Sequence, residues 1–186
     1  KQLRATAGGS KGYGGMDMGS MGGMGSMNGE MQSSMLGGAG DIKYPHYLIN
    51  GKTPAAPTTL SAKPGQRVRI RIINAGSDTA FRVALGDHRM TVTHSDGFPV
   101  VPVQTDALLI GMGERYDVAV TVQDGVFPLV ASAEGKDGRA LALVRTGSGH
   151  APGPTVHLAE FSRTVTSGTD LPALEPARPN TRGPDR

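Results

Sequence analysis

The chain has 186 residues and a formal net charge of +3, enough for one domain of ordinary size with residues to spare. It contains no cysteine, which excludes disulfides, a catalytic thiol, thiolate zinc sites and a blue-copper site built within this chain, because that copper site needs a thiolate. There is no block of like charge and no apolar run of about 18 residues. We therefore expect no nucleic-acid partner and no membrane span.

Residues 1–40 are rich in glycine, serine and methionine, and we expect a flexible segment there without an apolar signal-peptide core. The segment holds seven of the nine methionines: Met16, Met18, Met21, Met24, Met27, Met31 and Met35. The interspersed glycines disfavour a helix, because each costs about 1 kcal/mol relative to alanine. Thioethers suit Cu(I), so two interpretations remain open: a Cu(I)-binding segment, or a linker that is merely rich in methionine.

The first strands of the fold follow in residues 41–147, which carry nearly all the alternating apolar runs. Tyr47–Gly51 predicts a short strand that runs into a tight turn. Arg67–Ile73 alternates, with valine and isoleucine on one face and arginines on the other, as in a half-buried strand. We expect the arginine row to be solvated. A polar loop then leads to a second alternating strand, Phe81–Leu85.

Further strands are expected along the rest of this region. Alternation places Met90, Val92 and His94 on one face. The two prolines of Phe98–Val103 limit that segment to an edge or irregular strand. Tyr116–Val122 is a clear alternating strand. Shorter apolar runs predict strands at Ala107–Ile110, Val126–Ala131 and Arg139–Arg145, with Val156–Phe161 as one more candidate.

About eight one-faced strands, and no convincing helix, predict an all-β fold. We expect a Greek-key β-sandwich or barrel, because strands with one apolar face need a second layer. Three parts are expected: a flexible segment at residues 1–40, the β-domain at 41–161, and a proline-rich connector at 162–186.

No catalytic centre is evident from the residues alone. His88 and His94 have an even spacing and could share a strand face, but they lack an obvious third metal ligand. A hydrogen-bonded structural role is the favoured interpretation. The carboxylates mostly stand beside glycine or serine, where they favour turns. No nucleophile or phosphate-loop motif is present.

Four segments, in this order, carry a resemblance. They are YPHYLING (Tyr44–Gly51), KPGQRVRIRIINAGSDTAFRVAL (Lys63–Leu85), HRMTVTHSDGFPVVPVQTDALLIGMGERYDVAVTV (His88–Val122) and ALALVR (Ala140–Arg145). Over Tyr44–Phe161 the chain resembles the central cupredoxin-like domain of the three-domain, laccase-like multicopper oxidases. The Met-rich segment is similar to segments of copper-resistance oxidases.

The resemblance implies a parent enzyme that oxidises a reductant and reduces O₂ to water with copper ions held in its first and third domains. The central domain of this family usually holds no copper. It positions its neighbours and can form a wall of the substrate pocket. We therefore expect no catalytic residue in this chain, partners in the first and third domains of the same polypeptide, an inactive isolated chain, and an extracellular or periplasmic location.

Two rival hypotheses remain. One is a Cu(I)-binding or copper-delivery protein that acts through the Met-rich segment. The other is a β-sandwich that serves only as an interaction module.

Overall fold

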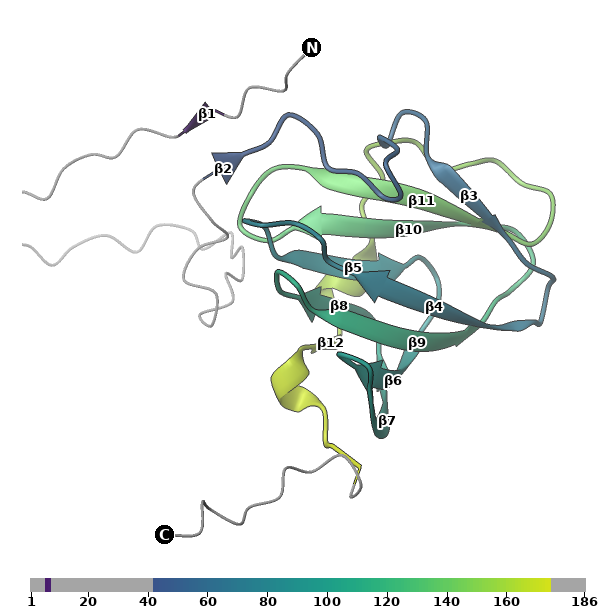
Figure 1. Cartoon of the computed structure of the whole chain (residues 1–186). Helices are drawn as coiled ribbons and strands as arrows, with labels where there is room; N and C mark the ends of the chain where they lie inside the picture. Colours follow the sequence, from purple (N-terminus) through teal and green to yellow (C-terminus); the bar gives the residue numbers. More distant parts are fainter. Residues whose placement is uncertain (1–5, 8–41, 175–186) are drawn as a thin grey trace, which may run out of the picture.

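Alternating side chains build two β-sheets that pack face to face (Figure 1). The computed structural model describes residues 6–7 and 42–174. One sheet runs, edge to edge, through β12 (Val165–Thr166), β8 (Ala107–Ile110), β5 (Phe81–Leu85), β10 (Val126–Ala133), β11 (Arg139–Arg145) and β3 (Thr58–Ser61). The other runs through β4 (Arg67–Ile73), β9 (Arg115–Thr121), β6 (Met90–Ser95) and β7 (Phe98–Thr105). The predicted all-β sandwich is confirmed.

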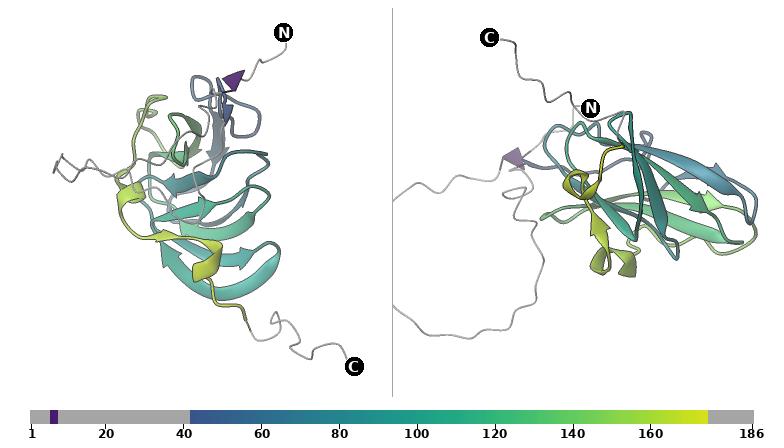
Figure 2. Two further views of the ribbon diagram at one scale, coloured as in Figure 1. Left: turned by 90° about the vertical axis from the view of Figure 1, so that its left-hand side faces the viewer. Right: turned by 90° about the horizontal axis from the view of Figure 1, so that it is seen from below.

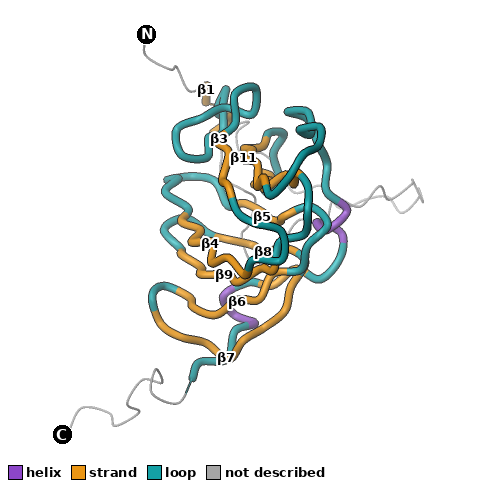
Figure 3. Tube along the Cα trace, turned by 90° about the vertical axis from the view of Figure 1, so that its right-hand side faces the viewer, coloured by secondary structure: helices purple, strands orange, loops and turns teal. Residues whose placement is uncertain are grey.

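Pairing within the two sheets is antiparallel except at two places, where β3 pairs with β11 and β12 with β8 in parallel. A further pair, β1 (Thr6–Ala7) with β2 (Ile42–Lys43), precedes the sandwich. Two 3₁₀ turns, η1 (Ala159–Ser162) and η2 (Gly168–Asp170), are the helical elements of residues 42–174 (Figure 3). No helix among the described residues is long and apolar enough to cross a membrane.

The main core lies between the two sheets and is made by the inward residue of each alternating pair. Its fully buried members include Leu85, Met90, Val92, Leu108, Ile110, Tyr116 and Val118. In β9, Tyr116, Val118 and Val120 point inward as predicted, while Arg115 and Thr121 are exposed. Burial of such side chains stabilises the fold by about 1.5–3 kcal/mol each relative to exposure.

A second apolar cluster covers the outer face of the six-stranded sheet, and the C-terminal segment makes that cover (Figure 2). Val130 and Leu141 point outward from β10 and β11, and Leu158 and Phe161 pack against them. Both faces of these strands are buried, so their sequences read as nearly continuous apolar runs. The expected strand at Val156–Phe161 is wrong, because this segment lies across the sheet and forms η1 instead of pairing at an edge.

The residues after 161 also pack on the sandwich. Val165 and Thr166 form β12 beside β8, and Leu171 packs against the main core. Ala173 forms an isolated bridge with Val100 of β7. The division into residues 1–40, 41–161 and 162–186 stays a prediction.

Candidate functional site

The histidines do not form a common site. The predicted shared face of Met90, Val92 and His94 is wrong, because a β-bulge between Val92 and His94 turns His94 to the outer face of the four-stranded sheet. His88 lies in the turn before β6, at the opposite end of that strand. Its Nδ1 lies 2.7 Å from the Gly86 carbonyl oxygen, and its Nε2 accepts a hydrogen bond from the Gln123 N–H at 3.0 Å. His88 is therefore a structural residue.

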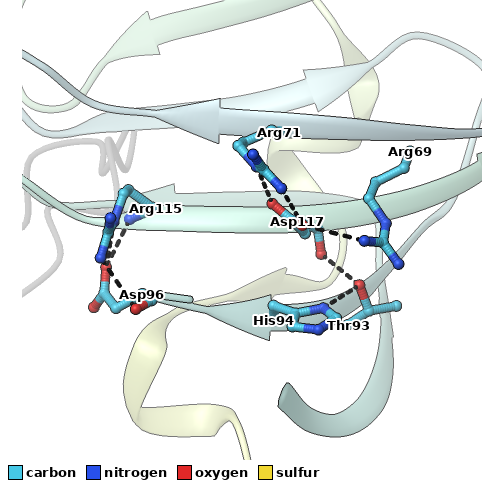
Figure 4. A network of polar contacts seen from close by, with 7 residues as sticks. All are labelled: Arg69, Arg71, Thr93, His94, Asp96, Arg115 and Asp117. Carbon is cyan, nitrogen blue, oxygen red and sulfur yellow. Dashed lines mark hydrogen bonds and ion pairs between the residues drawn. The ribbon is translucent and has the colours of Figure 1, made fainter. Parts of the chain in front are cut away.

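The outer face of the four-stranded sheet carries a charged network centred on Asp117 (Figure 4). Arg71 Nε and Nη2 donate to the two Asp117 carboxylate oxygens at 3.0 and 3.3 Å, and Arg69 Nη1 lies 3.7 Å away. The hydrogen bonds from Arg71 hold the pKa of Asp117 below its usual value. Asp117 stands mid-strand, so it is an exception to the expectation that the carboxylates occupy turns.

The rest of this network is also structural. The bulged Thr93 donates from Oγ1 to the Asp117 carbonyl oxygen at 3.1 Å, and His94 Nδ1 lies 3.1 Å from the same hydroxyl. Arg115 donates from its backbone N–H to Asp96 Oδ1 at 2.9 Å and from Nη2 to the Asp96 carbonyl oxygen at 3.1 Å. The arginine side chains remain more than half exposed, as predicted for the row on β4. The face is a basic, solvated surface.

Copper ligands of the kind that an oxidase needs do not gather in the described part of the chain. No group of three histidine, aspartate, glutamate or cysteine side chains that could hold a metal occurs among residues 6–7 and 42–174. The whole sequence has no cysteine, so the thiolate of a type 1 copper site cannot come from this chain. The seven methionines of residues 16–35 lie outside the described residues, and their binding of Cu(I) stays a prediction.

The feature that stands out is one end of the sandwich. Strand register places the end of β4, the start of β9 and the β6–β7 turn together there, because Ile73 pairs with Arg115 and Ser95 pairs with both Tyr116 and Phe98. The loops 74–80, 111–114 and 134–138 and the segment 44–51 lie at the same end. We call this the apolar end.

Four large apolar side chains project from the apolar end with high exposed fractions. These are Leu48 at 50 %, Ile73 at 56 %, Phe98 at 65 % and Met112 at 47 %. The turns that present them are fixed by backbone conformation: Asn50-Gly51 and Asp96-Gly97 have positive φ angles at both positions. Such a concentration of exposed apolar side chains is typical of a contact surface.

A glutamate fixes the loop that presents Met112. Glu114 Oε2 accepts hydrogen bonds from the Gly111 N–H at 2.6 Å and from the Tyr116 hydroxyl at 3.3 Å. Burial of Tyr116, with a smaller contribution from Glu114, raises the pKa of this phenol. The Gly113 N–H also donates to the Asn74 carbonyl oxygen, which ties the loop to the end of β4.

A hollow of about 810 Å³ opens beside these residues. Its lining extends from the rim at Tyr44–Gly51 to apolar side chains between the sheets, among them Leu60, Ile72 and Phe81. The volume is within the range of pockets that bind small molecules. The hydroxyl of Tyr47 is buried beside it without a hydrogen-bond partner in the described structure.

Lys136 holds the rim of the apolar end together, and sequence reasoning missed it. Its Nζ donates to Asp78 Oδ2 at 2.9 Å and to Thr79 Oγ1 at 3.1 Å, and it lies 5.9 Å from the ring centroid of Tyr44. The Tyr47 ring meets Tyr44 and Phe81 edge to face. These contacts join segments that are far apart in sequence, so local sequence pattern gives no signal for them.

The opposite end of the sandwich is built from polar loops, at residues 62–66, 86–89, 122–125 and 146–150, and we call it the polar end. None of the large, exposed apolar side chains of the described structure lies in those loops. Internal hydrogen bonds close them: the Gln123 N–H donates to His88, and the Gly125 N–H donates to Thr146 Oγ1 at 2.9 Å. The two ends therefore differ in what they offer a neighbour.

Known proteins show the same sequence pattern. The family described as multicopper oxidase matches residues 26–149. "Multicopper oxidase MmcO" of Mycobacterium tuberculosis is 63 % identical over 136 residues, which is 73 % of this chain and 27 % of that protein. "Copper resistance protein A homolog" of Pseudomonas syringae pv. tomato is 40 % identical over 94 residues, which is 50 % of this chain and 16 % of that protein. The chain thus spans about a quarter, or less, of the length of these relatives.

Solved structures show the same fold. The blue copper oxidase of Nitrosomonas europaea superposes on 65 % of this chain and 44 % of its own, with a TM-score of 0.51 and 23 % sequence identity. At that identity the likeness concerns the fold alone, and it is the cupredoxin-like β-sandwich.

Proposed function

Because this chain belongs to the multicopper oxidase family, we propose that it forms the central, non-catalytic domain of a longer, laccase-like copper oxidase. The parent protein would oxidise a reductant and pass the electrons to O₂, which is reduced to water. The relatives extend well beyond the matched region, which leaves room for the other domains.

The observation that carries this proposal is which possible copper ligands the chain has. Copper-dependent oxidation needs closely spaced histidines and, for the type 1 ion, a thiolate. The chain has no cysteine, and its described part brings no three suitable ligands together. The residues of this chain do not fit the family's copper sites, so the ligands would come from neighbouring domains. We expect the isolated chain to show no blue absorption band with Cu(II).

We further propose that the apolar end is the surface by which this domain positions its neighbours. Ile73, Phe98 and Met112 would be buried by the first or third cupredoxin domain of the same polypeptide, and the rim at Tyr44–Gly51 could supply a wall of the substrate pocket. Apolar side chains at the centre of such a contact usually carry most of its free energy. The family resemblance supports an extracellular or periplasmic location for the parent protein.

The test uses the full-length parent protein with Ile73, Phe98 and Met112 all changed to serine. We expect copper retention and oxidase turnover to fall roughly tenfold, because the copper domains lose their support. The matched control changes Lys63 and His150, which are exposed at the polar end, to serine. Full activity of the apolar-end variant would contradict the proposal.

A second role, Cu(I) binding, is favoured by the seven methionines of residues 16–35. Thioethers are neutral, soft ligands that suit this ion. Relatives of the chain carry the name copper resistance protein A, in keeping with copper handling. The segment would collect Cu(I) for oxidation by the parent enzyme, or act by itself in copper delivery.

This role is tested by titrating the 186-residue chain with Cu(I) against a competing chelator. Replacing the seven methionines by leucine keeps the apolar character and removes the sulfur, so it is the decisive variant. We expect the natural chain to compete for Cu(I) and the leucine variant to lose that ability. Equal binding by both chains would overturn the role.

A further inference from the structure

We propose that the free edge of β4 binds an extended segment of the parent polypeptide, from outside these 186 residues, in which acidic and apolar residues alternate. The inference rests on the proposed function, because it assumes a longer parent protein. It adds to that function where a contact by strand pairing is made and which side chains the partner strand needs.

β4 has an unpaired edge in the described structure. Among residues 42–174 it is the outermost strand of its sheet and pairs only with β9. The backbone bonds from Val122 N–H to Gln66 O and from Asn74 N–H to Glu114 O continue the β4–β9 ladder at even-numbered residues. Directions alternate along an antiparallel strand, so the N–H and C=O groups of Arg67, Arg69 and Arg71 point to the free edge. An added strand would pair with those groups.

The outer face of this edge is basic. Arg67, Arg69 and Arg71 project from it, and the last two side chains are 60 % and 66 % exposed. Asp117 neutralises part of this charge, because it accepts a hydrogen bond from Arg71 and lies 3.7 Å from Arg69. Residues of an added strand that pair with these arginines would place their side chains on the same face, about 4.5–5.5 Å away between Cβ atoms. Carboxylates at those positions complement the row.

The inner face of the same edge is apolar and incompletely covered. Val68, Ile70 and Ile72 point toward the core but are only partly buried, unlike their counterparts in β9. The hollow of about 810 Å³ lies against this strand, and its lining includes consecutive residues from Ile70 through Arg71 to Ile73. The hollow therefore lies along β4 itself. Apolar side chains of an added strand would enter there.

The two faces together define the occupant. A strand that meets arginines on one side and an apolar hollow on the other needs carboxylates at every second position and apolar residues between them. We assign the parent polypeptide as the source of this strand. The 136 matched residues cover only 27 % of the Mycobacterium tuberculosis relative, so most of such a protein lies outside this chain.

The experiment measures binding of a fluorescent Glu-Val-Glu-Val-Glu-Val-Glu peptide to the 186-residue chain by fluorescence anisotropy. We expect saturable binding that weakens as salt is added. Two control peptides keep one feature each: Lys-Val-Lys-Val-Lys-Val-Lys has the pattern with the wrong charge, and Glu-Glu-Glu-Glu-Val-Val-Val has the composition without the alternation. Neither control should bind.

Variants locate the contact. Arg69→Pro removes an N–H that points to the free edge and should weaken binding at least tenfold while leaving the β4–β9 ladder in place. Arg69→Gln should weaken binding roughly twofold to fivefold, as the loss of one cross-strand charge pair. Lys52→Gln removes the same charge from an exposed site off this edge and should leave binding unchanged.

Each outcome decides the matter. Absence of binding, or equal binding of the lysine peptide, would overturn the inference and leave the arginine row as a guard against edge aggregation. The full-length parent should fail to bind the peptide, because its own segment occupies the edge. If the parent binds the peptide as tightly as the 186-residue chain does, the added strand does not come from the parent polypeptide. A parent without oxidase activity would contradict the proposed function but not the peptide result.

Discussion

The two ends of the sandwich are closed by similar tight turns, yet they present opposite surfaces. The apolar end exposes Leu48, Ile73, Phe98 and Met112, while the loops of the polar end expose none of the large apolar side chains. Hydrogen bonds hold the loops together at both ends, from Lys136 at the apolar end and to His88 at the polar end. Exposure at the apolar end is therefore not a sign of poor folding. We propose that it marks the end that contacts a neighbouring domain.

The largest effect is expected from Gly138→Ala at the apolar end. Gly138 has φ +132°, and a Cβ there would clash with the Tyr47 ring. We expect a loss of about 3 kcal/mol in the free energy of unfolding, from strain and overpacking together. Gly65→Ala, at the polar end with φ +75° and open space around it, should cost only about 1 kcal/mol. Urea unfolding measures both, and equal losses would contradict the tight packing inferred for the rim.

His88→Leu tests the polar end. The change removes the acceptor for the Gln123 N–H and the partner of the Gly86 carbonyl oxygen in a buried site. We expect a loss of about 2 kcal/mol, because buried polar groups lose their hydrogen bonds. His46→Leu, at an exposed position of the apolar end, should change the stability by less than about 0.5 kcal/mol. A loss of stability from His46→Leu as large as that from His88→Leu would contradict the structural role assigned to His88.

Asp117→Asn provides a reference between the two ends. We expect a loss of about 1 kcal/mol near neutral pH, because the bonds from Arg71 weaken. The folded-state pKa of Asp117 is lowered, so its contribution is present above the unfolded pKa of about 4 and is lost as the pH falls through the folded pKa. The variant should therefore lose less stability than the natural chain on acidification. Parallel stability curves from pH 7 to pH 3 would refute this.

The smallest effect on folding is expected from Met112→Ser. The side chain is 47 % exposed, so the free energy of unfolding should change by less than about 0.5 kcal/mol. Binding of a hydrophobic dye to the isolated chain should nevertheless fall, because the apolar end loses exposed apolar area. Lys63→Ser at the polar end should leave dye binding unchanged. A fall in dye binding with both variants would contradict the difference in exposed apolar area between the two ends.

Local pattern predicted the strands well where one face is buried. Arg67–Ile73 and the inward residues of β9 follow the two-residue period because nothing interrupts it. The position of His94 could not be predicted in this way, because the bulge at Thr93 shifts the period by one residue. Sequence pattern predicts a strand at Val156–Phe161 where the structure has a covering segment, because a segment that covers a sheet is as apolar as a strand within it.

The candidate site was harder to predict than the fold. Leu48, Ile73, Phe98 and Met112 are distant in sequence, and only the strand register brings them to one end. The absence of cysteine did predict that a type 1 copper site cannot be completed in this chain. The exclusion followed from composition, whereas the contact surface required the three-dimensional arrangement.

Hydrogen–deuterium exchange of the full-length parent protein, compared with the isolated 186-residue chain, tests the central claim most directly. If this domain positions its neighbours through the apolar end, amides in 44–51, 73–80, 96–98 and 111–114 will exchange more slowly in the parent. Amides in the polar-end loops 62–66, 86–89 and 122–125 will exchange at the same rate in both. Protection of the polar end, or no protection at the apolar end, would contradict the account.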